Sequence, residues 1–69
     1  MENKIKKIKI RVVDVKTYPS YRYDEDYHQD MINNELDEIQ DGGNIVIGID
    51  SFKLGEGETA RIRTIITYR

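Results

Sequence analysis

The sequence predicts an α+β fold in which one helix packs on one face of a three-stranded sheet, in the chain order strand, helix, strand, strand. Apolar and polar residues alternate near the N-terminus, the period becomes helical in the middle, and alternation returns in two segments after a glycine pair. A right-handed crossover makes the first two strands parallel, and the third strand returns antiparallel between them in the order 1-3-2. Residues 1–69 are long enough for one small domain and too short for a second core.

The first strand is predicted over residues 4–15. Isoleucines and valine alternate with lysines and arginine up to Val12, a pattern typical of a strand with one buried face. We expect the apolar set to meet the helix and the basic set to face outward. Beyond Val12 the apolar phase changes to Val13 and Val15 around Asp14, which indicates a bulge or a twist at that point.

The helix is predicted over residues 24–41. Its apolar stripe consists of Ile32, Leu36 and Ile39, with His28 and Glu35 in phase and Met31 at the margin. Either Asp26, with a glutamine three residues later, or Asp24 caps the N-terminus. Gly42 and Gly43 end the helix, because glycine adopts the left-handed conformation of a helix stop without strain.

The second and third strands are predicted over residues 44–52 and 59–69, joined by a hairpin loop longer than two residues. The side chains expected against the helix are Ile8, Ile10, Val12, Ile45, Ile47, Ile49, Ile62 and Ile66. Those expected on the uncovered face are Lys7, Lys9, Arg11, Arg61, Arg63 and Arg69, with Val46, Phe52 and Ile65 among them. The uncovered face should therefore be basic with a small apolar centre. The second strand has no charge before Asp50, so its edge over residues 44–50 is a candidate homodimer interface.

The segment from His28 to Phe52, followed by "ARIRTIITYR", resembles the short acidic sporulation proteins of endospore-forming bacteria and related small phage proteins. The matching residues are Ile32, Asn33, Leu36, Gly43, Ile47, Ile49, Ile66, Tyr68 and Arg69. The resemblance covers roughly residues 28–69 and implies a βαββ fold and a bacterial or phage setting. It implies no activity. The tyrosine-rich loop and the lysine-rich first strand depart from the family pattern.

The loop "TYPSYRYDEDYH", residues 17–28, holds four of the five tyrosines. The rings that could stack on bases or a nucleotide are Tyr18, Tyr21, Tyr23 and Tyr27, with Arg22 and Lys16 binding phosphate. The simpler interpretation, which we favour, has Tyr23 packing near the helix start and the other rings covering the open end of a small core. A loop this aromatic is also a typical protein contact surface.

The sequence gives little support for a metal site, a phosphate-binding loop, an enzymatic activity or a membrane span. The chain has no cysteine, one histidine and two serines, so we expect no thiolate metal site, no cofactor and no enzymatic activity. His28 and the aspartates around it lack the glycine of a calcium loop. "LGEGET" lacks the lysine and the following helix of a phosphate-binding loop, and is read as a turn. No apolar stretch reaches the ~20 residues of a membrane span, so the expected setting is the cytoplasm, without membrane contact.

Charge is divided along the chain, with basic residues in excess over residues 1–16 and 51–69 and acids in excess between them. We therefore expect a small non-enzymatic interaction module that binds a protein partner or itself. The alternative is nucleotide or nucleic-acid binding through the basic sheet face, with Lys7, Lys9, Arg11, Arg61 and Arg63, and the tyrosine loop. Against this alternative, the net charge is −2 and the sheet centre lacks stacking aromatic rings.

Overall fold

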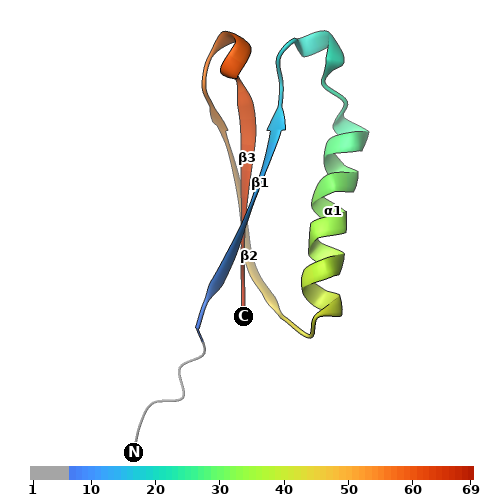
Figure 1. Ribbon diagram of the computed structural model, residues 1–69, viewed down its shortest axis with the longest axis vertical. Coiled ribbons are helices and arrows are strands. Elements are labelled where there is room, and N and C mark those ends of the chain that lie inside the picture. Colours follow the sequence, from blue (N-terminus) through green and yellow to red (C-terminus); the bar gives the residue numbers. More distant parts are fainter. Residues whose placement is uncertain (1–6) are drawn as a thin grey trace, which may run out of the picture.

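The computed structural model describes residues 7–69, in which a single helix packs beside a three-stranded sheet (Figure 1). The elements are β1 (Lys9–Lys16), α1 (Glu25–Asp41), β2 (Val46–Leu54) and β3 (Arg61–Tyr68), with short 3₁₀ turns at Ser20–Arg22 and Gly57–Thr59. The sheet order is β1-β3-β2, and β3 runs antiparallel to both neighbours. The predicted fold class and strand order are confirmed, and residues 4–6 of the predicted first strand lie outside the described residues.

Both ends of α1 are set by local hydrogen bonds. The Asp24 carboxylate accepts from the backbone N–H groups of Asp26, at 2.9 Å, and Tyr27, at 3.3 Å, so Asp24 is the N-cap. At the other end Gly43 has a φ of +83°, and the Asn44 side-chain amide donates to the Ile39 carbonyl at 3.2 Å. These contacts satisfy donors and acceptors that a helix terminus leaves without partners. The prediction that the two glycines end the helix is confirmed.

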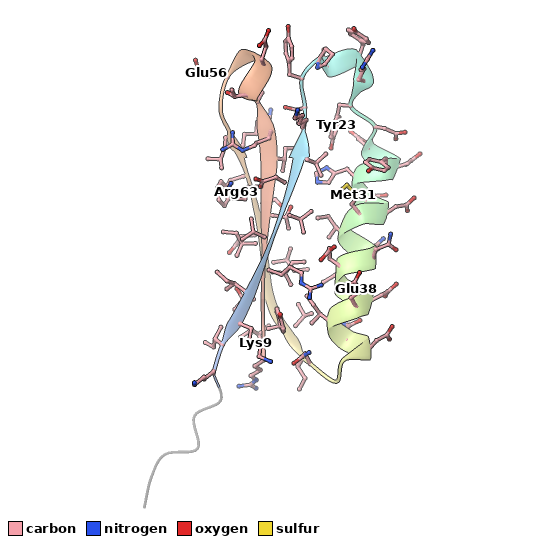
Figure 2. All side chains as sticks on the ribbon, viewed as in Figure 1. Lys9, Tyr23, Met31, Glu38, Glu56 and Arg63 are labelled. Atoms are coloured by element: carbon pink, nitrogen blue, oxygen red, sulfur yellow. The ribbon has the colours of Figure 1, made fainter. Side chains whose placement is uncertain are left out.

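The faces of β3 match the prediction. Thr64 and Ile66 are fully buried on the side of α1, while Arg63 and Ile65 lie on the opposite side. In Figure 2, Met31 on α1 points toward the strands, and Arg63 lies on the side of the sheet away from the helix. The alternation of a regular strand explains this division.

The predicted faces of β1 are wrong. Val13 and Val15 are buried opposite Thr64 and Ile62, whereas Ile10 and Val12 point away from α1. β1 pairs with β3 without any register shift, so the phase change predicted near Val12 does not occur as a bulge. Successive side chains of a regular strand point to opposite faces, so Ile10 and Val12 cannot be buried on the same face as Val13 and Val15. In this structure the face that carries Val13 and Val15 is the buried one. Lys9 and Arg11 consequently lie on the helix side.

The bulge is on β2 instead. Val46 lies opposite Tyr68 and Gly48 opposite Thr67, so Ile47 has no partner of its own on β3. Ile45 and Ile47, both predicted to meet the helix, are about half exposed, as is Ile49. Val46 takes the helix side, contrary to its predicted place on the outer face. The helix therefore shields β2 less than the sequence pattern suggested.

The buried core is small for a chain of this length. Among residues 7–69 only four apolar side chains are buried, namely Val13, Val15, Ile39 and Ile66. Domains below about 70 residues commonly need a disulfide, a metal or oligomerisation to supplement such a core. The chain has no cysteine. A large share of its apolar surface stays accessible in the isolated subunit.

Candidate protein-interaction surface

The side of the sheet opposite α1, called the open face below, carries apolar side chains on all three strands, exposed on β1 and β2 and half-buried on β3. Its members on the three strands are Ile10, Val12, Asp14, Lys16, Gly48, Asp50, Phe52, Leu54, Arg61, Arg63, Ile65 and Thr67. Ile10 is 63% exposed, Val12 48% and Phe52 42%. Val12 lies directly opposite Ile65, which occupies the central strand. No helix or strand among residues 7–69 covers this face (Figure 1).

An ion-pair cluster lies beside this apolar area. Asp14 accepts two hydrogen bonds from Arg63, at 2.8 and 2.9 Å, and its carboxylate lies 3.7 Å from Arg61. These contacts lower the pKa of Asp14, chiefly through the Arg63 hydrogen bonds, and raise the pKa of Arg63. The bidentate geometry fixes both side chains in register across β1 and β3. Phe52 faces Arg63 from the opposite strand.

The residues predicted to form one basic surface are divided between the two sides of the sheet. Arg11 reaches across to α1, where it donates to Glu35 at 2.9 Å and to Glu38 at 3.2 Å. The Glu35 hydrogen bond is the main reason that the pKa of Arg11 is raised. Arg61 and Arg63 lie on the open face beside Asp14, whereas the exposed Lys9 lies on the helix side and Lys7 precedes β1. The open face is therefore apolar with both signs of charge, and the predicted basic face is wrong.

The tyrosines do not gather into one platform. Tyr23 is half-buried, and its hydroxyl lies 2.7 Å from Nδ1 of His28, with the two rings edge to face. Tyr21 is 82% exposed, while Tyr18 and Tyr27 are also exposed. Tyr23 thus packs near the helix start as predicted, but Tyr21 does not close the end of the core. Arg22 is exposed in the same loop.

A cleft of about 350 Å³ between α1 and β2 was missed by the sequence reasoning. Its lining comprises His28, Gln29, Ile32, Asn33, Ile49, Ser51 and Thr64. The Ser51 and Thr64 hydroxyls are hydrogen-bonded to each other at 2.8 Å. The only sequence signal was the pair Gln29 and Asn33, which places two amides at helical spacing beside the apolar stripe. This pair borders the predicted stripe rather than interrupting it.

Two further observations concern ions and membranes. Among residues 7–69, histidine and acidic side chains do not come together in a group of three that could hold a metal ion. In the same part of the chain, no helix combines the length and the apolar character that crossing a bilayer requires.

Comparisons of the chain with protein-family models, with curated proteins and with solved structures find no match. The resemblance to sporulation and phage proteins therefore depends on the sequence pattern alone and stays a prediction.

Proposed function

We propose that this protein is a non-enzymatic interaction module that associates with a second copy of itself through the open face. The observation that carries the proposal is the uncovered apolar area formed by Ile10, Val12, Phe52 and Ile65. Exposed apolar patches on small proteins commonly mark interaction sites. The small core adds a thermodynamic reason, because association removes further apolar surface from water.

The size of the face is compatible with a modest dimer interface. β1 and β3 have eight residues each and β2 has nine. Strands about 4.8 Å apart with about 3.3 Å per residue give a face of roughly 14 by 26 Å. Protruding side chains present more accessible surface than this projection, so two copies would bury on the order of 1,000 Å² in total, the lower range for a specific interface.

The charge on the open face favours a copy of the same face as partner. Asp14 and Asp50 contribute negative charge, and Lys16, Arg61 and Arg63 contribute positive charge. Two such faces do not repel each other strongly, unlike two faces of a single sign. Asp14 and Arg63 already neutralise each other, which lowers the cost of removing them from water.

The experiment is sedimentation equilibrium over a wide concentration range. We expect the mass of the wild type to rise toward that of a dimer, and Val12→Asp to weaken association by about 100-fold or more, because each dimer would bury two new unpaired charges. Ile49→Asp is the matched control, since Ile49 is 48% exposed, as Val12 is, but lies opposite Ile66 on the helix side of the sheet. A wild type that stays monomeric, or a Val12→Asp variant that associates like the wild type, would contradict the proposal.

The expected setting is an extension of this proposal. The absence of cysteine supports a reducing compartment such as the cytoplasm. The resemblance noted in the sequence supports a spore-forming bacterium or its phage as the source. Nucleic-acid binding is the less favoured alternative, because Arg11, Arg61 and Arg63 are engaged by carboxylates on opposite sides of the sheet.

A further inference from the structure

The cleft between α1 and β2 opens beside a strand edge. β2 has β3 as its only neighbour among residues 7–69, so the backbone groups along its other edge have no strand partner there. An extended peptide at this edge would lie about 4.8 Å from β2 and would direct alternate side chains toward α1. The bulge is confined to Val46–Gly48, and the cleft-lining residues Ile49 and Ser51 follow it in regular register with β3.

The chemistry of the cleft selects an aliphatic side chain. Ile32 on α1 and Ile49 on β2 provide apolar walls, and Ile49 is 48% exposed. Apart from His28, no lining residue is ionisable. The side-chain amides of Gln29 and Asn33 lie at the same cleft and can hydrogen-bond to a peptide backbone. A volume of about 350 Å³ is at the lower end of ligand clefts and suits side chains of an extended segment rather than a helix.

The charge of α1 selects a basic partner. The helix contains seven acids and no lysine or arginine. Glu35 and Glu38 bind Arg11, whereas the remaining acids form no ion pair within residues 7–69. These are Glu25, Asp26, Asp30, Asp37 and Asp41. α1 as a whole is thus strongly negative, although none of these five acids lines the cleft, and an extended segment with lysine or arginine next to its aliphatic residues complements the charge of the helix.

We infer that this cleft binds an extended segment of a partner protein in which aliphatic and basic residues alternate, added as a fourth strand along β2. The inference goes beyond the proposed self-association, which uses the opposite side of the sheet. The aliphatic side chains enter the cleft between Ile32 and Ile49. The basic side chains contact the acids of α1, and the backbone pairs with β2.

The test uses a blocked hexapeptide in which lysine alternates with isoleucine, titrated into the full chain and followed by backbone amide NMR shifts. We expect shifts concentrated at His28–Asn33 and Ile49–Ser51, slower hydrogen exchange at β2 amides, and weaker binding at higher salt. A peptide with glutamate in place of lysine should bind at least about tenfold more weakly. A peptide with alternate N-methylated amides should also lose affinity, because it cannot complete the strand pairing.

Two variants and one control locate the site. Ile49→Lys and Asn33→Lys, both at exposed positions, should each weaken peptide binding about tenfold or more by adding positive charge to the cleft. Val12→Asp on the open face should bind the peptide like the wild type while losing self-association. The two proposals can therefore be contradicted independently of each other.

An absence of shifts at millimolar peptide, shifts confined to the open face, or equal affinity for the glutamate peptide would overturn the inference. Protection of β2 in a dimer of the protein alone, lost in Ile49→Lys, would also overturn it by making a second copy the occupant.

Discussion

The Arg11 guanidinium on β1 donates to the Glu35 carboxylate on α1 at 2.9 Å, joining residues 24 positions apart in the sequence. This contact places an arginine between helix and sheet, on the side where the sequence pattern predicted isoleucines. It also explains why Ile10 and Val12, the immediate neighbours of Arg11 in β1, point away from the helix. Because Arg11 faces the helix, Ile10 and Val12 contribute apolar side chains to the open face.

Removal of Arg11 should therefore destabilise the fold through the helix contact. We expect Arg11→Ala to lower the urea midpoint of unfolding more than Lys9→Ala, because Lys9 is exposed on the same side of β1. Glu35→Gln in the Arg11→Ala background should add little further loss, since the pair is already broken. Additive losses from the two substitutions would show that the pair is not coupled.

Ile66 is the clearest core position, with no exposed surface on the central strand. We expect Ile66→Val to reduce the free energy of unfolding by about 1 kcal/mol and Ile66→Ala by about 2–5 kcal/mol, which is enough to unfold a small domain. Ile10→Val is the control, and it should change the stability of the monomer by less than about 0.5 kcal/mol, because Ile10 is 63% exposed. Equal effects at the two positions, measured by urea unfolding, would contradict the assignment of the core.

Asp24 should carry most of the capping energy of α1. Asp24→Ala is expected to cost about 1 kcal/mol of unfolding free energy, because two backbone N–H groups lose their acceptor. Asp26→Ala should cost less, since Asp26 only adds charge to the first turn. The comparison of both variants by thermal unfolding decides between the two caps that the sequence allowed. A larger loss in Asp26→Ala would contradict the observed cap.

Gly55 and Gly57 both have positive φ angles, of 76° and 55°, in the loop between β2 and β3. A Cβ atom at Gly55 would clash with the Thr59 carbonyl oxygen, whereas nothing lies within 4 Å of one at Gly57. We expect Gly57→Ala to cost about 1–2 kcal/mol, the penalty of the left-handed conformation. Gly55→Ala should cost clearly more, because the loop must also move. Equal unfolding midpoints for the two variants would contradict this loop geometry.

Acid should weaken the link between β1 and β3 at Asp14. The pKa of Asp14 is lowered by the Arg63 hydrogen bonds, so the pair contributes stability above the ordinary aspartate pKa of about 3.9. That contribution is lost as the pH falls below about 4 and through the lowered pKa. In urea unfolding from pH 6 to 2, the wild type should exceed Asp14→Asn in stability at pH 6, and the difference should shrink below about pH 4. A difference that does not change over this range would contradict the assignment.

The sequence allowed the element order, the strand order and the faces of β3 to be predicted, because long regular patterns specify them. It did not allow the faces of β1 to be predicted. Ile10 and Val12 would lie on one face of this strand and Val13 and Val15 on the other, and either apolar pair could face the helix. The Arg11 contact that accompanies the observed phase is made with residues on a different element. The cleft at Ile49 likewise depends on the position of α1 beside β2, which no local pattern encodes.

The most direct test of the open face as a contact between copies is an isotope-filtered NOE experiment on a mixed sample of labelled and unlabelled protein. The proposed dimer predicts intermolecular NOEs that involve the Val12 and Ile65 methyl groups and the Phe52 ring. A concentrated sample without intermolecular NOEs, or with NOEs only from side chains on the helix side of the sheet, would contradict it.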